Sequence, residues 1–166
     1  MTAAVMCSII LTVLFTGAVI MRERKVPESI SAMVFALPEG GWQWLWTVWL
    51  WAVDILTFAP VIGLLEERGV AYLGFATMAC LAFVGVWPLF DTEHRKWHYL
   101  LAVIGGILSQ VCILFICHQL LWVWPAVALL AITSAAGRWR GVWLRMTLIS
   151  EVVCYATVTT AEMLCR

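Results

Sequence analysis

Long apolar stretches separated by short polar connections make up most of this chain. A helix needs about 20 apolar residues to cross the hydrocarbon core of a bilayer, and six stretches reach or approach that length. The pattern therefore predicts an all-α polytopic membrane protein, a bundle of six transmembrane helices in a single domain over residues 1–166. The predicted helices span about 2–21, 42–65, 70–90, 97–118, 121–136 and 142–164.

Basic residues gather in alternate connections, which predicts the orientation of the bundle. Eight of the ten Lys and Arg residues follow the first, third or fifth predicted helix, so they share one side of the membrane if all six helices cross. Cytoplasmic loops are enriched in Lys and Arg. We therefore expect both termini to lie outside the cytoplasm (N-out/C-out), in a bacterial cytoplasmic membrane. The eight residues are Arg22, Arg24, Lys25, Arg95, Lys96, Arg138, Arg140 and Arg145.

The connection 27–41 (PESISAMVFALPEGG) is longer than the others and has an apolar centre. That centre is too short to cross the bilayer. We expect it to lie at the cytoplasmic interface as a half-buried helix, or to enter the membrane as a re-entrant element whose backbone is shielded by protein.

Composition supports the membrane assignment and excludes some functions. Hydrophobic residues make up 64% of the chain and charged residues 12%, against about 45–50% and about 25% in ordinary soluble domains. The formal net charge is zero and no long basic run is present, so nucleic acid is not an expected partner. The six cysteines form no CxxC pair. They are expected to act as small hydrophobic residues, and no cofactor is predicted.

Two acidic residues inside predicted helices are candidates for a ligand- or ion-binding site. Asp54 lies about halfway along the second helix, and Glu151 lies about two turns into the sixth. A carboxylate in a bilayer is costly, so such a residue faces the bundle interior, finds a partner or stays protonated. Gln110 in the fourth helix and Glu151 are the first choices as further polar neighbours of Asp54. The other available partners are Thr57, Ser109, Ser150, Tyr155 and Thr157. The pattern fits a proton- or ion-sensitive site, and it equally fits a structural hydrogen bond between helices.

A polar turn before the fourth predicted helix contains candidate metal ligands. His94 and His98 have the i, i+4 spacing that places two imidazoles on one helical face, and Asp91 or Glu93 would supply an oxygen ligand. The general base of an HExxH motif is missing, because Arg95 occupies its position. The segment is interpreted either as a zinc site or as a solvated turn that caps the fourth helix.

Two short segments resemble known membrane families. The helix 98–110 (HYLLAVIGGILSQ) opens with His98 after a polar turn and resembles the corresponding helix of the DUF998 and FRAG1/DRAM/Sfk1 families of small six-helix membrane proteins. The segment 27–35 (PESISAMVF) resembles a Pro-x-Ser-Ile-Ser stretch in small membrane proteins of Bacteroidota, with Met33, Val34 and Phe35 where tyrosines are expected. The resemblance implies a six-helix bundle and no particular activity.

These features favour a non-enzymatic protein that binds or interacts within the bilayer. Its expected partners are membrane lipids, a small apolar ligand, or membrane subunits that include further copies of the chain. The first alternative is a small transporter or channel-like oligomer that uses Asp54. The second alternative is a metal-dependent intramembrane hydrolase that uses His94 and His98.

Overall fold

The regular structure of the protein is helical throughout the described residues, which in this computed structural model are 3–37, 42–90, 95–138, 140–143 and 145–165. Five α-helices of 19 to 24 residues form the body of the fold. They are α1 (Ala3–Glu23), α2 (Gln43–Glu66), α3 (Ala71–Phe90), α4 (Arg95–Cys117) and α7 (Met146–Leu164). Three stretches, Ala3–Glu23, Gln43–Glu66 and Trp97–Ala136, are long and apolar enough to cross a membrane. The chain is therefore a helical membrane protein.

Shorter elements complete the described part of the chain. A 3₁₀-helix, η1, lies between α1 and α2, and a second, η2, follows α4. A short α-helix, α5, is extended by a π-helical turn, η3, and a single further turn, α6, precedes α7. Their bounds are η1 (Ser31–Ala36), η2 (His118–Trp122), α5 (Val123–Thr133), η3 (Ser134–Arg138) and α6 (Arg140–Trp143).

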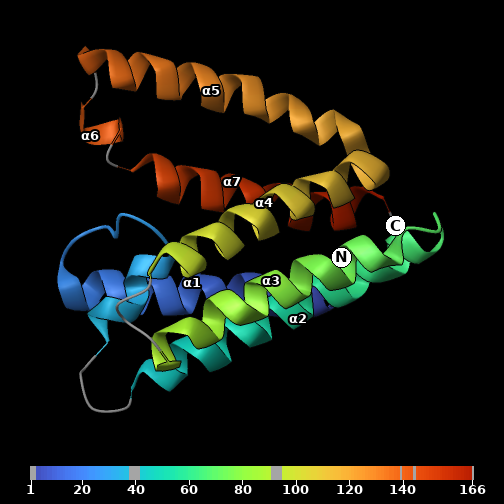
Figure 1. The fold of residues 1–166 in the computed structure, drawn as a ribbon, viewed down its shortest axis with the longest axis horizontal. Coiled ribbons are helices and arrows are strands. Elements are labelled where there is room, and N and C mark those ends of the chain that lie inside the picture. The colour runs from blue at the N-terminus through green and yellow to red at the C-terminus, as the bar shows by residue number, and fades with distance from the viewer. Residues whose placement is uncertain (1–2, 38–41, 91–94, 139, 144, 166) are drawn as a thin grey trace.

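The six-helix prediction is confirmed in part, because the structure has five long helices rather than six. The predicted fifth helix, 121–136, is divided between η2, an α5 of only 11 residues, and η3. The break before it is at Cys117, whose backbone leaves the helical region (φ −152°, ψ 72°). Pro125 also lacks the N–H that would continue an α-helical ladder back into this turn. The apolar stretch Trp97–Ala136 is therefore two helical arms that reverse direction, as Figure 1 shows.

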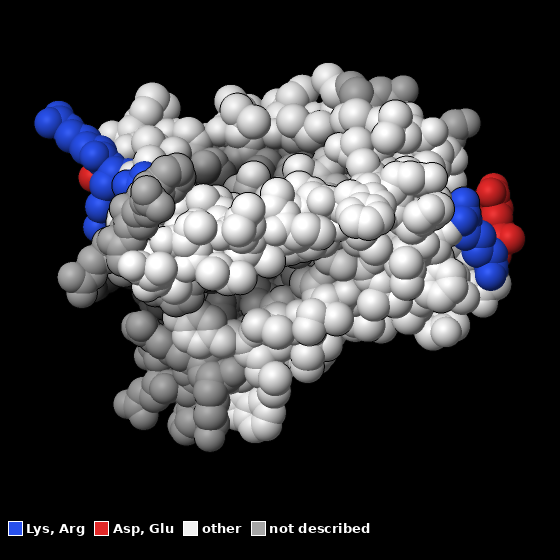
Figure 2. Space-filling view, turned by 90° about the horizontal axis from the view of Figure 1, so that it is seen from above, with Lys and Arg blue, Asp and Glu red and all other residues white. Residues whose placement is uncertain are grey.

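Consecutive helices run antiparallel, and both chain ends lie toward the same end of the molecule (Figure 1). The turn between α2 and α3 is tight. Gly69 adopts a positive φ of 72°, and the Val70 N–H donates to the Leu65 carbonyl at 3.0 Å. This is the hydrogen bond that closes a helix whose last turn is followed by a left-handed glycine. Charged side chains lie at the two ends of the molecule, with uncharged residues between them, in the view of Figure 2.

Two apolar clusters hold the described helices together. One joins η1 to α1 and α2 through Val19, Met33, Val34, Trp46, Trp49 and Val53. The other joins α2, α4 and α7 through Phe58, Val61, Leu64, Leu65, Cys112, Ile113, Ile116, Val158 and Ala161. Without a hydrophobic driving force between helices in lipid, such close packing is a main source of association.

Glycines permit the close approach of α3 to its two neighbours, as expected of membrane helices. A Cβ atom on Gly74 would lie 2.5 Å from Cγ1 of Ile62 on α2. A Cβ atom on Gly105 would lie 3.2 Å from Cβ of Cys80 on α3. Replacing either glycine with a larger residue would therefore force the neighbouring side chain, and with it the packing of the two helices, to shift.

The predicted interfacial or re-entrant segment folds back onto the bundle. Its centre is η1, which buries Met33 and Val34 to 1% and 2% exposure against α1 and α2. Residues 38–41 of that segment lie outside the described part of the chain. Its placement relative to a bilayer surface stays a prediction.

Candidate functional site

Asp54 lies inside the bundle, on a buried face of α2. Its exposed fraction is 4%. The carboxyl atom Oδ1 is buried and has no hydrogen-bond partner among the described residues. A buried polar atom without a partner is uncommon in folded proteins and calls for an explanation. Thr57, one helical turn further along α2, belongs to a cluster of hydroxyl groups described next.

A hydroxyl cluster joins α1, α2 and α7. The Ser8 hydroxyl is fully buried and lies 2.7 Å from the Thr57 hydroxyl and 2.7 Å from the Tyr155 hydroxyl. Thr12 donates to the Tyr155 hydroxyl at 3.4 Å. Because residues three apart on a helix are neighbours, Asp54 borders this cluster through Thr57. Four hydroxyl groups from three helices therefore lie together inside the bundle.

Gln110 forms a second cluster, which joins α4, α5 and α7. Its side-chain Oε1 accepts hydrogen bonds from Trp124 Nε1 at 2.9 Å and from the Thr157 hydroxyl at 3.1 Å. Its Nε2 donates to the Ser109 hydroxyl at 3.1 Å. One amide therefore connects three helices, and the bond from Trp124 fixes the start of α5 to the rest of the molecule.

The two clusters reach α7 at neighbouring positions, on different faces of that helix. Tyr155 belongs to the hydroxyl cluster, whereas Thr157 belongs to the Gln110 cluster, and the Cys154 thiol hydrogen-bonds to Ser109. We call this set the polar layer; its members are Ser8, Asp54, Thr57, Ser109, Gln110, Trp124, Tyr155 and Thr157. Asp54 is its one acidic member. The layer provides hydroxyl, amide and carboxyl groups in an otherwise apolar interior.

Glu151 binds a different part of the structure from Asp54 and Gln110. Its Oε2 accepts the backbone N–H of Ile30, and its Oε1 accepts the Ser31 hydroxyl at 3.4 Å. Both donors precede or begin η1, where backbone N–H groups have no partner within the helix. A second tie links the same two segments, because the Leu148 N–H donates to the Glu28 carbonyl at 3.2 Å. Glu151 thus caps η1 from α7.

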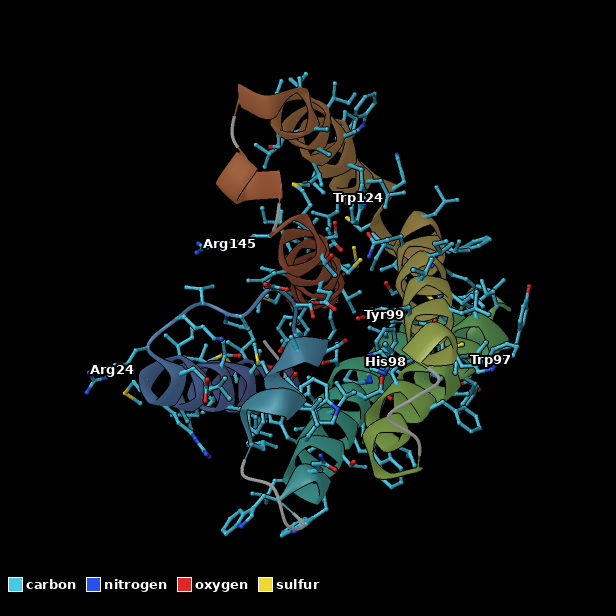
Figure 3. The ribbon with its side chains drawn as sticks, turned by 60° about the vertical axis from the view of Figure 1, so that its left-hand side comes forward. Arg24, Trp97, His98, Tyr99, Trp124 and Arg145 are labelled. Carbon is cyan, nitrogen blue, oxygen red and sulfur yellow. The ribbon has the colours of Figure 1, made fainter. Side chains whose placement is uncertain are left out.

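His98 is buried at the start of α4, with an exposed fraction of 8%. It hydrogen-bonds to the backbone of Val84 on α3, and its Nδ1 has no partner among the described residues. Figure 3 shows His98 beside Trp97 and Tyr99 at the first turn of α4. The other candidate ligands, Asp91, Glu93 and His94, lie outside the described residues. Within the described part of the chain, no group of three His, Cys, Asp or Glu side chains is placed to hold a metal ion.

Sequence reasoning named Asp54, Gln110 and Glu151, with Thr57, Ser109, Tyr155 and Thr157 among the available partners, but it did not include Ser8 or Trp124 among them. Ser8 was hidden in an apolar stretch that showed no polar pattern, and Trp124 was interpreted only by its place at a helix end. The partner of Glu151 is largely a backbone N–H, which every residue but proline carries. The sequence therefore does not show which backbone N–H will bind Glu151.

Comparison with protein-family models, with curated proteins and with solved structures finds no match to this chain. The resemblance described for 98–110 and 27–35 therefore rests on those residues alone.

Proposed function

We propose that this chain is a multi-pass protein of a bacterial cytoplasmic membrane that binds an apolar partner within the bilayer. In this proposal, α1, α2, α3, α4, the arm formed by η2, α5 and η3, and α7 make six crossings, with both termini outside the cytoplasm. The antiparallel order of the helices (Figure 1) supports this orientation, because it brings the end of α1, with Arg22, Arg24 and Lys25, and the start of α7, with Arg145, to the same end of the molecule.

The observation that carries the binding proposal is the loose attachment of α5. None of its residues is buried, although it is almost wholly apolar. Trp124, Val127 and Leu130 form a half-buried stripe on one face, and Leu129 and Ile132 are 63% and 68% exposed on the other. Figures 1 and 3 both place α5 at the edge of the bundle. An apolar arm that packs weakly on its neighbours offers a face to an acyl chain.

A membrane lipid is the partner that this arrangement favours. The arm is held near one end by the Trp124–Gln110 hydrogen bond. The remaining contact surface of α5 is apolar and suits a hydrocarbon chain. A helix of another membrane subunit, including a second copy, is the rival occupant.

Native mass spectrometry of the detergent-purified protein tests this proposal. We expect phospholipid to remain bound to the wild type and to be reduced by Leu130→Trp, which fills space on the half-buried stripe. Leu129→Trp is the matched control, because Leu129 points away from the bundle, and it should retain lipid as the wild type does. A lipid-free chain that runs as a dimer would favour the subunit partner, and a lipid-free monomer would contradict both.

A small transporter that uses Asp54 is the second candidate function. The unpartnered Oδ1 of a 4% exposed carboxyl favours it, because ionisable groups inside membranes mark ion and proton pathways. In this case Asp54→Asn should abolish proton uptake into proteoliposomes while leaving the fold intact. Equal uptake by the variant and the wild type would exclude Asp54 as the proton site.

A further inference from the structure

Two cysteines far apart in the sequence come together at the end of the molecule opposite the basic loops. Cys117 is the last residue of α4, and Cys165 directly follows α7. The Cys165 thiol donates to the Ile116 carbonyl at 3.5 Å, so it reaches the residue beside Cys117. The Cys117 thiol lies close enough to the Cys165 thiol to influence its ionisation. Both are free thiols and partly exposed.

The backbone at both positions departs from regular helix. Cys117 has φ −152° and ψ 72°, at the point where α4 gives way to η2. Cys165 has φ −105° and ψ 14° at the end of α7. A disulfide requires a specific separation and direction of the two Cβ atoms. Residues at helix ends adjust to that geometry without disrupting a helical hydrogen-bond ladder.

The other described thiols face different groups. Cys112 lies 3.7 Å from the Thr77 hydroxyl, and Cys154 hydrogen-bonds to Ser109. Cys80 and Cys154 approach Gly105 and Gly106 respectively, on different faces of α4. Cys7 is exposed on α1. The contact between Cys117 and Cys165 therefore sets these two thiols apart from the rest.

Two further polar contacts lie beside the pair at the end of α4. Arg68, in the turn between α2 and α3, donates from Nη1 to the Phe115 carbonyl. The Cys117 thiol donates to Gln119 Oε1 at 3.4 Å. Burial, and next the neighbouring Cys117 thiol, raise the pKa of the Cys165 thiol, while the Arg68 charge opposes this. Because the thiolate is the attacking species, oxidation of the pair accelerates as the pH rises.

We propose that Cys117 and Cys165 form a reversible intramolecular disulfide that fastens the turn between α4 and α5 to the end of α7. The oxidant is a disulfide-bearing acceptor. One cysteine thiolate attacks the acceptor disulfide and releases one acceptor thiol. The second thiolate then attacks the mixed disulfide and releases the other, so two protein thiols are oxidised and one acceptor disulfide is reduced to two thiols.

The disulfide would join the arm that carries α5 to the bundle. In the reduced protein, α5 is attached at η2 and by the Trp124–Gln110 hydrogen bond. The disulfide would add a covalent tie between α7 and Cys117, the residue directly before η2. Disulfides persist outside the reducing cytoplasm. Whether the disulfide forms in the cell therefore rests on the proposed N-out/C-out orientation, whereas its formation in purified protein does not.

The test uses the full chain with Cys7, Cys80, Cys112 and Cys154 replaced by Ser or Ala, in detergent and in liposomes. The protein is treated with a membrane-permeant aromatic disulfide, then acid-quenched, denatured and weighed intact. We expect the chain to lose two hydrogens without gaining an adduct, and to regain both thiols in dithiothreitol. A second chain that retains only Cys80 and Cys154 is the control, and it should gain adducts instead.

Adducts on both Cys117 and Cys165, or a disulfide between chains only, would overturn the proposal. The same experiment on wild-type protein shows whether the four cysteine replacements themselves change the result. Because the oxidant is added to purified protein, the outcome does not depend on membrane orientation. Alkylation of whole cells at the moment of lysis then tests the compartment separately: a disulfide in the cells supports exposure to the exterior, and two free thiols in the cells would contradict that part alone.

Discussion

Asp54 differs from the other members of the polar layer because one of its carboxyl oxygens has no hydrogen-bond partner among the described residues. The sequence singled out this residue, since an acid within an apolar stretch is visible without any structure, and the structure buries it. Its orientation into the bundle also followed from the cost of facing lipid. Thr57 and Tyr155 were available partners in the sequence, but their meeting with Ser8 did not follow, because it depends on how three helices rotate about their axes.

Replacing Asp54 should cost little stability if the carboxyl is structural. We expect Asp54→Asn to change the free energy of unfolding by under about 1 kcal/mol, since interhelical hydrogen bonds in membranes average about 0.6 kcal/mol. Unfolding in SDS followed by circular dichroism measures this. Thr57→Val is the control, because it removes a hydroxyl that has a partner 2.7 Å away. A loss above about 3 kcal/mol for Asp54→Asn would mean that the carboxyl holds an essential partner, as with a broken buried ion pair.

Glu151 gives a second residue-scale prediction, on the anchoring of η1. Glu151→Ala removes the acceptor for the Ile30 N–H and the Ser31 hydroxyl. Leaving such donors unpaired costs about 1–3 kcal/mol, so amide hydrogen exchange over residues 27–37 should accelerate. Glu28→Ala is the matched control, because its side chain is exposed on the same segment and its effect should be small. Unchanged exchange in Glu151→Ala would contradict the capping role.

At the scale of elements, the sequence predicted the places of five long helices within a few residues and misjudged the nature of the fifth predicted helix. Uniform apolarity marks a stretch that suits the bilayer, but it does not mark where the backbone leaves α-helical geometry. Pro125 was the visible signal, since it fits the first turn of a helix better than its interior. The departure at Cys117 carries no signal in residue type. The 27–41 connection was recognised as unusual, whereas its insertion of Met33 and Val34 was not.

The coupling between Gln110 and Trp124 tests how α5 is attached. A double-mutant cycle with Gln110→Leu and Trp124→Phe isolates their interaction from the effects of each change alone. We expect a coupling of about 0.6 kcal/mol and at most about 1.7 kcal/mol in free energy of unfolding, because Trp124 Nε1 donates to Gln110 Oε1 at 2.9 Å. The pair Gln110→Leu and Trp122→Phe is the control, since Trp122 is 77% exposed. Additive effects in both cycles would show that α5 does not depend on this bond.

Basic residues of the described structure lie at the ends of its helices, and this connects sequence to membrane orientation. Arg22 and Arg24 lie at the end of α1 and Arg145 lies at the start of α7, and these two helix ends share one end of the molecule, whereas Arg68 lies in the turn between α2 and α3 at the other (Figure 1). The antiparallel order of the helices places alternate connections at the same end (Figure 1). The sequence predicted this arrangement because charge and hydrophobicity are properties of residue type. The polar layer and the Cys117–Cys165 contact were not predictable in this way, since both join residues distant in the chain.

The position of the C-terminus relative to the membrane tests the account most directly. A reporter fused after Arg166, either alkaline phosphatase or green fluorescent protein, distinguishes the two compartments in a bacterial host. Fusions to residues 25 and 68 are the controls for the two sides of the bundle. Six crossings with both termini outside predict an active phosphatase and a dark fluorescent protein after Arg166 and after residue 68, with the opposite result after residue 25. A fluorescent reporter after Arg166 together with an active phosphatase after residue 68 would contradict the account, and would mean that the arm containing α5 does not cross.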